Sequence, residues 1–174
     1  MSSGAWTTPV KTWTFGYNVK AVDMNAEVKD RMNFLFDPPS ANATCTSSTV
    51  SATSWTAFGG SHQVTVTTVG GRLYAMYSGS FELTRDISTS DGEAWVSLLL
   101  DDVQTGPIIY VGSTANGNPF VGAVSIFADL GTPTAGSHTV KVAGRVRFTT
   151  VHLKLDGASA GGVTAQGQLS VRGY

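Results

Sequence analysis

The sequence has little charge and almost no cysteine, and both shortages narrow the kind of protein it encodes. Asp, Glu, Lys and Arg make up 13% of its 174 residues, against about 25% in average soluble proteins. Lys and Arg are scattered, so the concentrated basic face of a nucleic-acid-binding protein is missing. The single cysteine, Cys45, excludes an intrachain disulfide and a cysteine-rich metal cluster, and we expect it to be a small buried residue.

Long hydrophobic runs are also lacking. No apolar stretch reaches the ~18 residues that cross a membrane, and residues 1–20 lack the pattern of a signal peptide. We therefore expect a protein that is made and assembled in a cytosol, without membrane insertion. Hydrophobic residues still make up 41% of the chain, which is enough for a folded core. The length suits one domain with an appendage.

The residue patterns of common catalytic and cofactor sites are missing as well. His62, His138 and His152 show neither the His-x-His nor the His-Glu-x-x-His spacing of a metal site, and no glycine-rich loop has the pattern of a phosphate cradle. Asp101 and Asp102 are neighbours on a strand and so point to opposite faces, which favours a solvated strand end over a loop-bound cation. A catalytic arrangement assembled only by the fold stays open. We predict no enzyme activity, no catalytic residue, no cofactor and no metal site.

The first feature that the sequence does contain is a predicted N-terminal anchor over residues 1–39. Residues 21–36 form the only convincing helix, with an apolar stripe on one face and Pro38-Pro39 at its end. Such a short helix is not stable alone, and the aromatic stretch before it cannot bury itself. Both segments either pack on the rest of the protein or dock on a partner, and we favour a partner. The predicted assembly contacts are Trp6, Pro9, Trp13, Met24, Val28, Met32 and Leu35.

The rest of the chain has only strand and turn patterns. Residues 40–57 are rich in Ser and Thr and are predicted to be a linker that merges into the first strand. Residues 58–174 show about eight or nine regularly spaced strands, the pattern of an antiparallel β-sandwich or jelly roll. The pair Gly70-Gly71 predicts a hairpin between its flanking strands. The alternation of apolar residues changes parity at Thr149-Thr150, which predicts a bulge or tight turn there.

Two segments resemble proteins of tailed-bacteriophage particles. The N-terminal segment resembles a module at the start of phage virion proteins, with Lys20 in place of its usual threonine cap. The residues that carry this resemblance are Trp6-Thr7-Thr8-Pro9, Thr12-Trp13, Gly16 and the stretch from Asp23-Met24-Asn25 through Val28-Lys29-Asp30-Arg31-Met32-Asn33-Phe34-Leu35. Gly136-Ser137-His138-Thr139-Val140-Lys141-Val142 and Leu169-Ser170-Val171-Arg172 are similar to the trimeric jelly-roll domains of phage fibres, spikes and decoration proteins. The resemblance covers residues 6–36 and 136–172.

This resemblance implies a structural subunit of a phage virion, assembled in the bacterial host cytoplasm. The N-terminal arm would anchor it to other capsid or tail proteins, and a trimeric β domain would be displayed outward. Its partners would be copies of itself and other virion proteins, without nucleic acid. The alternative is a host-receptor or carbohydrate-binding module of a head or tail fibre. In that case Asp91, Asn116 and Asn118 are candidate contacts, and Trp95 or Tyr110 would stack on sugars.

Overall fold

The computed structural model describes residues 38–86, 92–114, 119–157, 159–160 and 163–174. The predicted helix over residues 21–36 lies outside these residues. So do all the predicted anchor contacts, which are Trp6, Pro9, Trp13, Met24, Val28, Met32 and Leu35.

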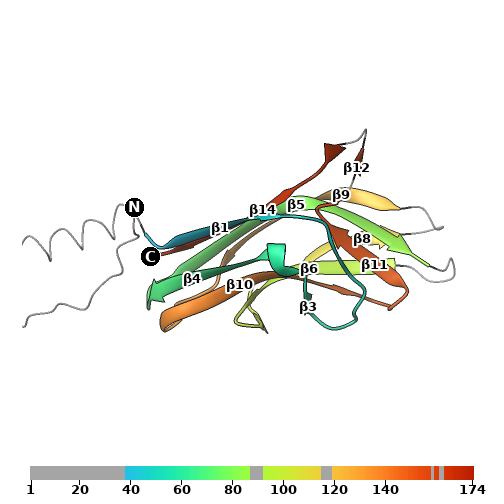
Figure 1. The fold of residues 1–174 in the computed structure, drawn as a ribbon. Helices are drawn as coiled ribbons and strands as arrows, with labels where there is room; N and C mark the ends of the chain where they lie inside the picture. The colour runs from blue at the N-terminus through green and yellow to red at the C-terminus, as the bar shows by residue number, and fades with distance from the viewer. Residues whose placement is uncertain (1–37, 87–91, 115–118, 158, 161–162) are drawn as a thin grey trace, which may run out of the picture.

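The described residues form two antiparallel sheets that pack face to face as a β-sandwich (Figure 1). Sheet A has the order β1 (Ser40–Cys45), β14 (Gly167–Gly173), β5 (Leu73–Arg85), β11 (Val151–Leu155) and β2 (Ser48–Val50), with β9 (Phe120–Asp129) also paired to β5. Sheet B has the order β3 (Thr56–Ala57), β10 (Ala135–Val146), β6 (Gly92–Leu100) and β7 (Val103–Gln104), with β4 (Gln63–Val69) paired to β10 and β8 (Ile109–Thr114) to β6. The prediction of a mainly β, antiparallel sandwich is confirmed.

Two smaller elements complete the described chain. The 3₁₀ turn η1 (Gly60–His62) leads directly into β4. The strands β12 (Ser159–Ala160) and β13 (Val163–Thr164) form a separate two-stranded sheet, which projects from one end of the sandwich in Figure 1. Among the described residues, no helix is long and apolar enough to cross a membrane.

The core lies between the sheets, and strands such as β5 alternate buried residues with more exposed ones, whereas β6 is buried continuously from Val96 to Leu99. Along β5, Leu73 and Tyr77 are fully buried whereas Met76 is 47% exposed. Sheet B supplies the opposing layer, for example Leu98 of β6 and Val142 of β10, both at 0% exposure. Side chains on a strand point alternately to its two faces, so this pattern turns one face of each sheet inward.

The Ser/Thr-rich segment 40–57 differs from the linker that its composition suggests. It contains β1, β2 and β3, and β1 pairs along its whole length with β14, from Ser40 opposite Arg172 to Cys45 opposite Gly167. Ser and Thr are tolerated here because β1 alternates polar residues with small apolar ones that face the core. The sandwich therefore begins at Ser40.

The hairpin predicted at Gly70-Gly71 is wrong, although a turn is present. β4 pairs only with β10, whereas β5 pairs with β14, β11 and β9 of the other sheet. The chain therefore crosses between layers at this point, with Gly70 at a φ of +91°. A glycine pair allows positive φ but does not decide which sheet the next strand joins.

The parity change at Thr149-Thr150 is confirmed as a tight turn. The Val151 N–H donates to the Phe148 carbonyl oxygen at 2.9 Å, and the chain passes from β10 of sheet B to β11 of sheet A. The buried faces of the two sheets point toward each other. When the chain turns from one sheet to the other, its apolar residues still face the core only if they move to the other set of alternate positions.

The two ends of the sandwich lie side by side. β1 and β14 are neighbours in sheet A, and the Gly173 N–H donates to the Pro39 carbonyl oxygen at 2.8 Å. Figure 1 shows β1 and β14 running together toward one end of the domain. Whatever precedes Pro38 therefore leaves the sandwich next to its C-terminus.

Candidate functional site

Exposed apolar side chains gather on the outer face of sheet A. Met76 of β5 is 47% exposed, Phe127 of β9 is 68% exposed, and Tyr174 beyond β14 is 52% exposed. The same strands add small uncharged side chains on this face, namely Ser78, Ala123, Ser125 and Ser170. Large exposed apolar residues next to small neutral ones are typical of a surface that contacts another protein or a ligand.

Part of this face is hollowed into a groove of about 860 Å³. Tyr74 and Phe127 stack at its wall with ring centroids 6.0 Å apart, and Tyr174 meets Tyr74 edge-on at 5.8 Å. Arg72 lies at the same groove and pairs with Asp129 at 2.7 Å. The groove therefore combines an aromatic surface with the Arg72–Asp129 ion pair and the side chain of Arg172, which also lines it.

Further ion pairs lie on other parts of the sandwich surface. On sheet A the pairs Lys154–Glu82 and His152–Asp86 lie toward the other end of β5, away from the groove. On sheet B, Lys141 pairs with Asp102 at 2.6 Å. The groove end of sheet A is distinguished by its exposed aromatic side chains, and it is the best candidate for a buried contact.

Sheet B carries the aromatic residues that the sequence favoured for sugar stacking. Trp95 and Tyr110 lie beside each other with ring centroids 6.0 Å apart, and Tyr110 is 53% exposed. The guanidinium group of Arg145 lies 4.8 Å from the centre of the Trp95 ring and 5.2 Å from that of Trp55. Arg145 thus occupies one ring face of Trp95 through a cation–π contact. The other three candidate contacts, Asp91, Asn116 and Asn118, lie outside the described residues.

Asp101 and Asp102 form the turn between β6 and β7. Both have positive φ, +49° and +68°, as the two central residues of a type I′ hairpin turn require. Asp101 accepts hydrogen bonds from the Thr139 N–H at 2.8 Å and from His138 Nδ1 at 2.7 Å. Asp102 pairs with Lys141, so both carboxylates already have protein partners.

His138 faces a hydrogen-bond acceptor on each ring nitrogen. Nδ1 contacts Asp101, and Nε2 lies 2.7 Å from the Thr134 carbonyl oxygen. Only the doubly protonated ring donates on both sides. The hydrogen bond that His138 donates to Asp101 raises the pKa of His138 and lowers the pKa of Asp101. The arrangement is a pH-dependent structural contact.

Ser51, His152 and Asp86 form a second chain of contacts. The Ser51 hydroxyl lies 2.5 Å from His152 Nδ1, and His152 Nε2 lies 2.9 Å from Asp86 Oδ2. In a serine hydrolase triad the ring has the opposite orientation, with Nε2 toward serine and Nδ1 toward a buried aspartate. Asp86 is 62% exposed here. The order of contacts therefore does not match the triad, and the absence of enzyme activity stays a prediction.

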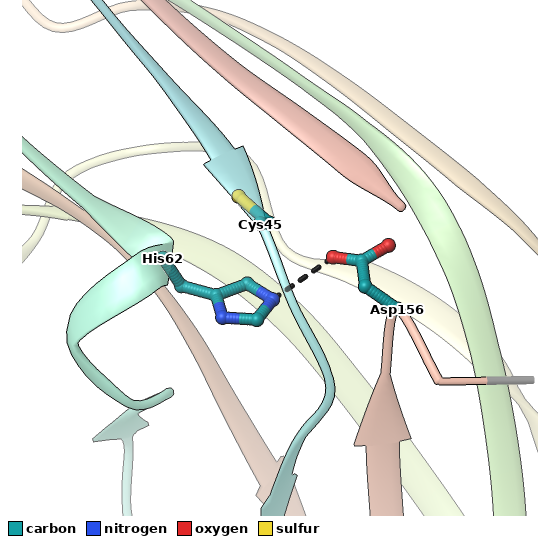
Figure 2. Close-up of side chains that lie close together, drawn as sticks. All are labelled: Cys45, His62 and Asp156. Carbon is teal, nitrogen blue, oxygen red and sulfur yellow. Dashed lines mark hydrogen bonds and ion pairs between the residues drawn. The ribbon is translucent and has the colours of Figure 1, made fainter. Parts of the chain in front are cut away.

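The most enclosed polar cluster lies between the sheets and consists of Cys45, His62, Tyr77 and Asp156. Figure 2 shows the side chains of Cys45, His62 and Asp156, which converge from β1, η1 and the end of β11. All four are at 0% exposure. Cys45 Sγ, a ring nitrogen of His62 and a carboxylate oxygen of Asp156 all lie within 4.8 Å of one another.

Asp156 is the centre of this cluster. Its Oδ2 accepts from the Tyr77 hydroxyl at 2.6 Å and contacts His62 Nε2 at 2.9 Å, while its Oδ1 accepts from the Ser80 N–H at 3.1 Å. Burial, followed by the hydrogen bond to Asp156, raises the pKa of Tyr77. Buried carboxylates are costly unless they are hydrogen-bonded, and these contacts meet that requirement.

Local backbone features make room for the carboxylate. Asp156 has a φ of +52°, a left-handed conformation that Asp adopts more readily than most residues. A Cβ atom at Gly79 or Gly167 would collide with the Asp156 carboxylate. These two glycines therefore leave the space that the buried acid occupies.

The surroundings of Cys45 disfavour the thiolate form. Burial and the charge of Asp156 raise the pKa of its thiol to about 11. Cysteine nucleophiles instead have a lowered pKa and a partly exposed sulfur. Its expected burial is confirmed. Its neighbours are the polar groups of Asp156 and His62, which the sequence did not indicate.

Comparisons with known proteins add little. No family model matches the chain, and no curated protein matches it. One solved structure with some similarity is the EclA C-terminal domain, a sugar-binding protein, at 15% sequence identity and a TM-score of 0.35. The match covers 64% of this chain and 74% of that chain. A likeness this low carries no argument about ligand or partner.

Proposed function

We propose that the protein is a structural subunit of a tailed-phage particle. In this proposal the sandwich forms a homotrimer through the outer face of sheet A, and residues 1–39 attach it to other virion proteins. The carrying observation is the group of exposed apolar side chains Met76, Phe127 and Tyr174 on the outer face of sheet A.

Two features support this arrangement. The sandwich begins at Ser40 beside its own C-terminus, so attachment through residues 1–39 leaves the opposite end of the domain free to face outward. An apolar face packed around a threefold axis removes the aromatic residues of three subunits from water at once. The resemblance of residues 6–36 to phage virion modules supports a phage particle as the larger assembly to which the subunit attaches.

The trimer is tested by the mass of the full chain in solution. Light scattering at micromolar concentration should give three times the subunit mass of 18.2 kDa. Phe127→Glu should give a monomer because it places a charge in the proposed interface. Phe127 is 68% exposed in the single chain, so this change should not unfold it.

The matched control is Ile108→Glu. Ile108 is also exposed, at 50%, but it lies next to β8 of sheet B, outside the proposed interface. This variant should keep the trimer. A monomeric wild-type chain, or a trimer that survives Phe127→Glu, would contradict the proposed interface.

Attachment is tested on purified particles of the phage whose genome carries this sequence. We expect the chain in the particle by mass spectrometry, and a version lacking residues 1–39 should fail to be incorporated when it is supplied in trans. Particles without the chain would contradict a virion role, whereas incorporation of the shortened chain would contradict the anchor alone.

The groove favours a second candidate function, binding of a host-surface glycan. Its volume of about 860 Å³ lies in the range of ligand pockets, and it is lined by Tyr74, Phe127 and Tyr174, whose rings suit stacking on sugar rings. A glycan array with the full chain tests this function. Binding that Phe127→Ala abolishes without a change in mass would favour the glycan role over the trimer interface.

A further inference from the structure

The buried cluster of Cys45, His62 and Asp156 has a composition that a purely hydrogen-bonded core does not need. Asp156 already has donors in Tyr77 and the Ser80 N–H. Cys45 is the only cysteine of the chain, and its Sγ makes a long hydrogen bond of 3.9 Å to the Ala43 carbonyl oxygen. Thiolate, imidazole and carboxylate are together the usual ligands of zinc.

The distances suit a single ion. In a tetrahedral zinc site with bonds of about 2.0–2.3 Å, donor atoms lie about 3.3–3.7 Å apart. The three donor atoms here lie within 4.8 Å of one another, and the closest pair, His62 Nε2 and Asp156 Oδ2, is 2.9 Å apart. Side-chain movements of about 1 Å are enough to convert this arrangement into coordination. The Tyr77 hydroxyl, 2.6 Å from Asp156 Oδ2, places a fourth possible donor atom at the cluster.

The surrounding contacts orient the donor atoms. The Ser61 hydroxyl lies 3.3 Å from His62 Nδ1, which leaves Nε2 directed toward the cluster. The Ser80 N–H holds Asp156 Oδ1, which leaves Oδ2 directed to the same point. Such outer contacts fix the ring orientation of ligating histidines and are part of most metal sites.

We propose that Cys45, His62 and Asp156 bind one zinc ion, as a structural site that ties the end of β1, the turn η1 and the end of β11 together. On binding, the Cys45 thiol loses its proton to solvent and its sulfur bonds the metal. The His62 ring proton moves from Nε2 to Nδ1, where the Ser61 hydroxyl oxygen accepts it. One proton is therefore released per ion bound, and binding strengthens as pH rises. The sequence-based expectation of no metal site is replaced by this proposal.

Because the three residues are at 0% exposure, the metal must be offered while the chain folds. The full chain is refolded from urea with zinc, or with chelator only, and then passed through gel filtration. We expect one zinc per chain in the first sample. Its melting temperature should be about 5–10 °C higher, as follows from binding at about 100 times the dissociation constant.

Cobalt tests the ligands directly. Refolding with Co²⁺ should give the near-ultraviolet charge-transfer band of a cobalt–thiolate bond. Cys45→Ser should lose this band, and His62→Gln should weaken metal retention at least tenfold. The matched control is His152→Gln, which removes a histidine that also contacts an aspartate but lies outside the cluster and should bind metal as the wild type does.

Calcium and magnesium should not replace zinc because both prefer sites made only of oxygen. The proposal is overturned if the refolded wild-type chain retains no zinc and shows no rise in melting temperature, a result that needs no variant. It is also overturned if His152→Gln loses as much metal as Cys45→Ser. Neither outcome bears on the trimer or on phage attachment, because the cluster lies inside one subunit.

Discussion

The Asp156 carboxylate depends on individual donors, and the Tyr77 hydroxyl makes the shortest of its hydrogen bonds at 2.6 Å. Tyr77→Phe keeps the ring in the core but removes the closest of the hydrogen-bond donors to the fully buried Asp156 carboxylate. We expect a loss of about 1–3 kcal/mol in the free energy of unfolding. Urea denaturation of the metal-free chain measures it.

The control for this change is Tyr110→Phe, because Tyr110 is 53% exposed and its hydroxyl meets water. We expect this variant to stay within about 0.5 kcal/mol of the wild type. Equal effects of the two substitutions would show that the Asp156 network contributes no stability.

His138 and Asp101 give the protein a stability that depends on pH. The His138 pKa is raised in the folded state, so its contribution is complete below the ordinary value of 6.5 and is lost as pH rises through the raised value. The Asp101 pKa is lowered, so its contribution is present above the ordinary value of 3.8 and is lost as pH falls through the lowered value. The contact therefore stabilises most between these two ordinary values.

His138→Gln tests this window by thermal denaturation. The difference in melting temperature between the wild type and the variant should be larger at a pH of about 5 than at a pH of about 9, because the imidazolium form is lost at the higher pH. A difference of the same size at both pH values would mean that His138 acts through packing alone.

At the scale of elements, β5 must pass close to the Asp156 carboxylate, and Gly79 makes that approach feasible. A Cβ atom there would collide with both Asp156 Oδ1 and the Tyr77 hydroxyl. Gly79→Ala should therefore destabilise the sandwich by about 3 kcal/mol, since packed cores accommodate added methyl groups poorly. The measurement is the midpoint of urea denaturation.

Gly60 in η1 provides the comparison, because a Cβ atom there would have no neighbour within 4 Å. Gly60→Ala should change the free energy of unfolding by less than about 0.5 kcal/mol. If Gly79→Ala were equally mild, β5 would have to lie farther from Asp156 than the structure places it.

At the scale of the whole molecule, the sandwich should fold without residues 1–39. The described core runs from Cys45 to Val171, and the first strand begins at Ser40. A chain of residues 40–174 should keep its β circular dichroism and melt within a few degrees of the full chain. It should also keep the trimer, because the outer face of sheet A is intact.

An unfolded or aggregated 40–174 fragment would mean that residues 1–39 complete the core. A folded monomer would place part of the trimer contact in residues 1–39 instead of on sheet A. Circular dichroism and light scattering on one preparation separate these results.

The predictions that succeeded rest on local periodicity. The alternation of Val64 and Val66 with Thr65 and Thr67 predicts a strand with one buried face, and these residues lie in the strand Gln63–Val69 with both valines buried. The parity change at Thr149-Thr150 predicted a turn for the same reason. Local periodicity did not predict which strands pair with each other. A turn such as Gly70-Gly71 has the same residues whether the chain returns to the same sheet or crosses to the other one.

The sequence by itself determined the class of fold, because a two-residue alternation of apolar side chains is only buried efficiently by sheets packed face to face. It did not indicate the cluster of Cys45, His62 and Asp156, in which the last two residues are 94 positions apart. It also did not indicate which exposed apolar residues share one face. Both depend on strand pairing and on the packing of the two sheets, which are decided by contacts between distant segments, so only the tertiary structure brings these side chains together.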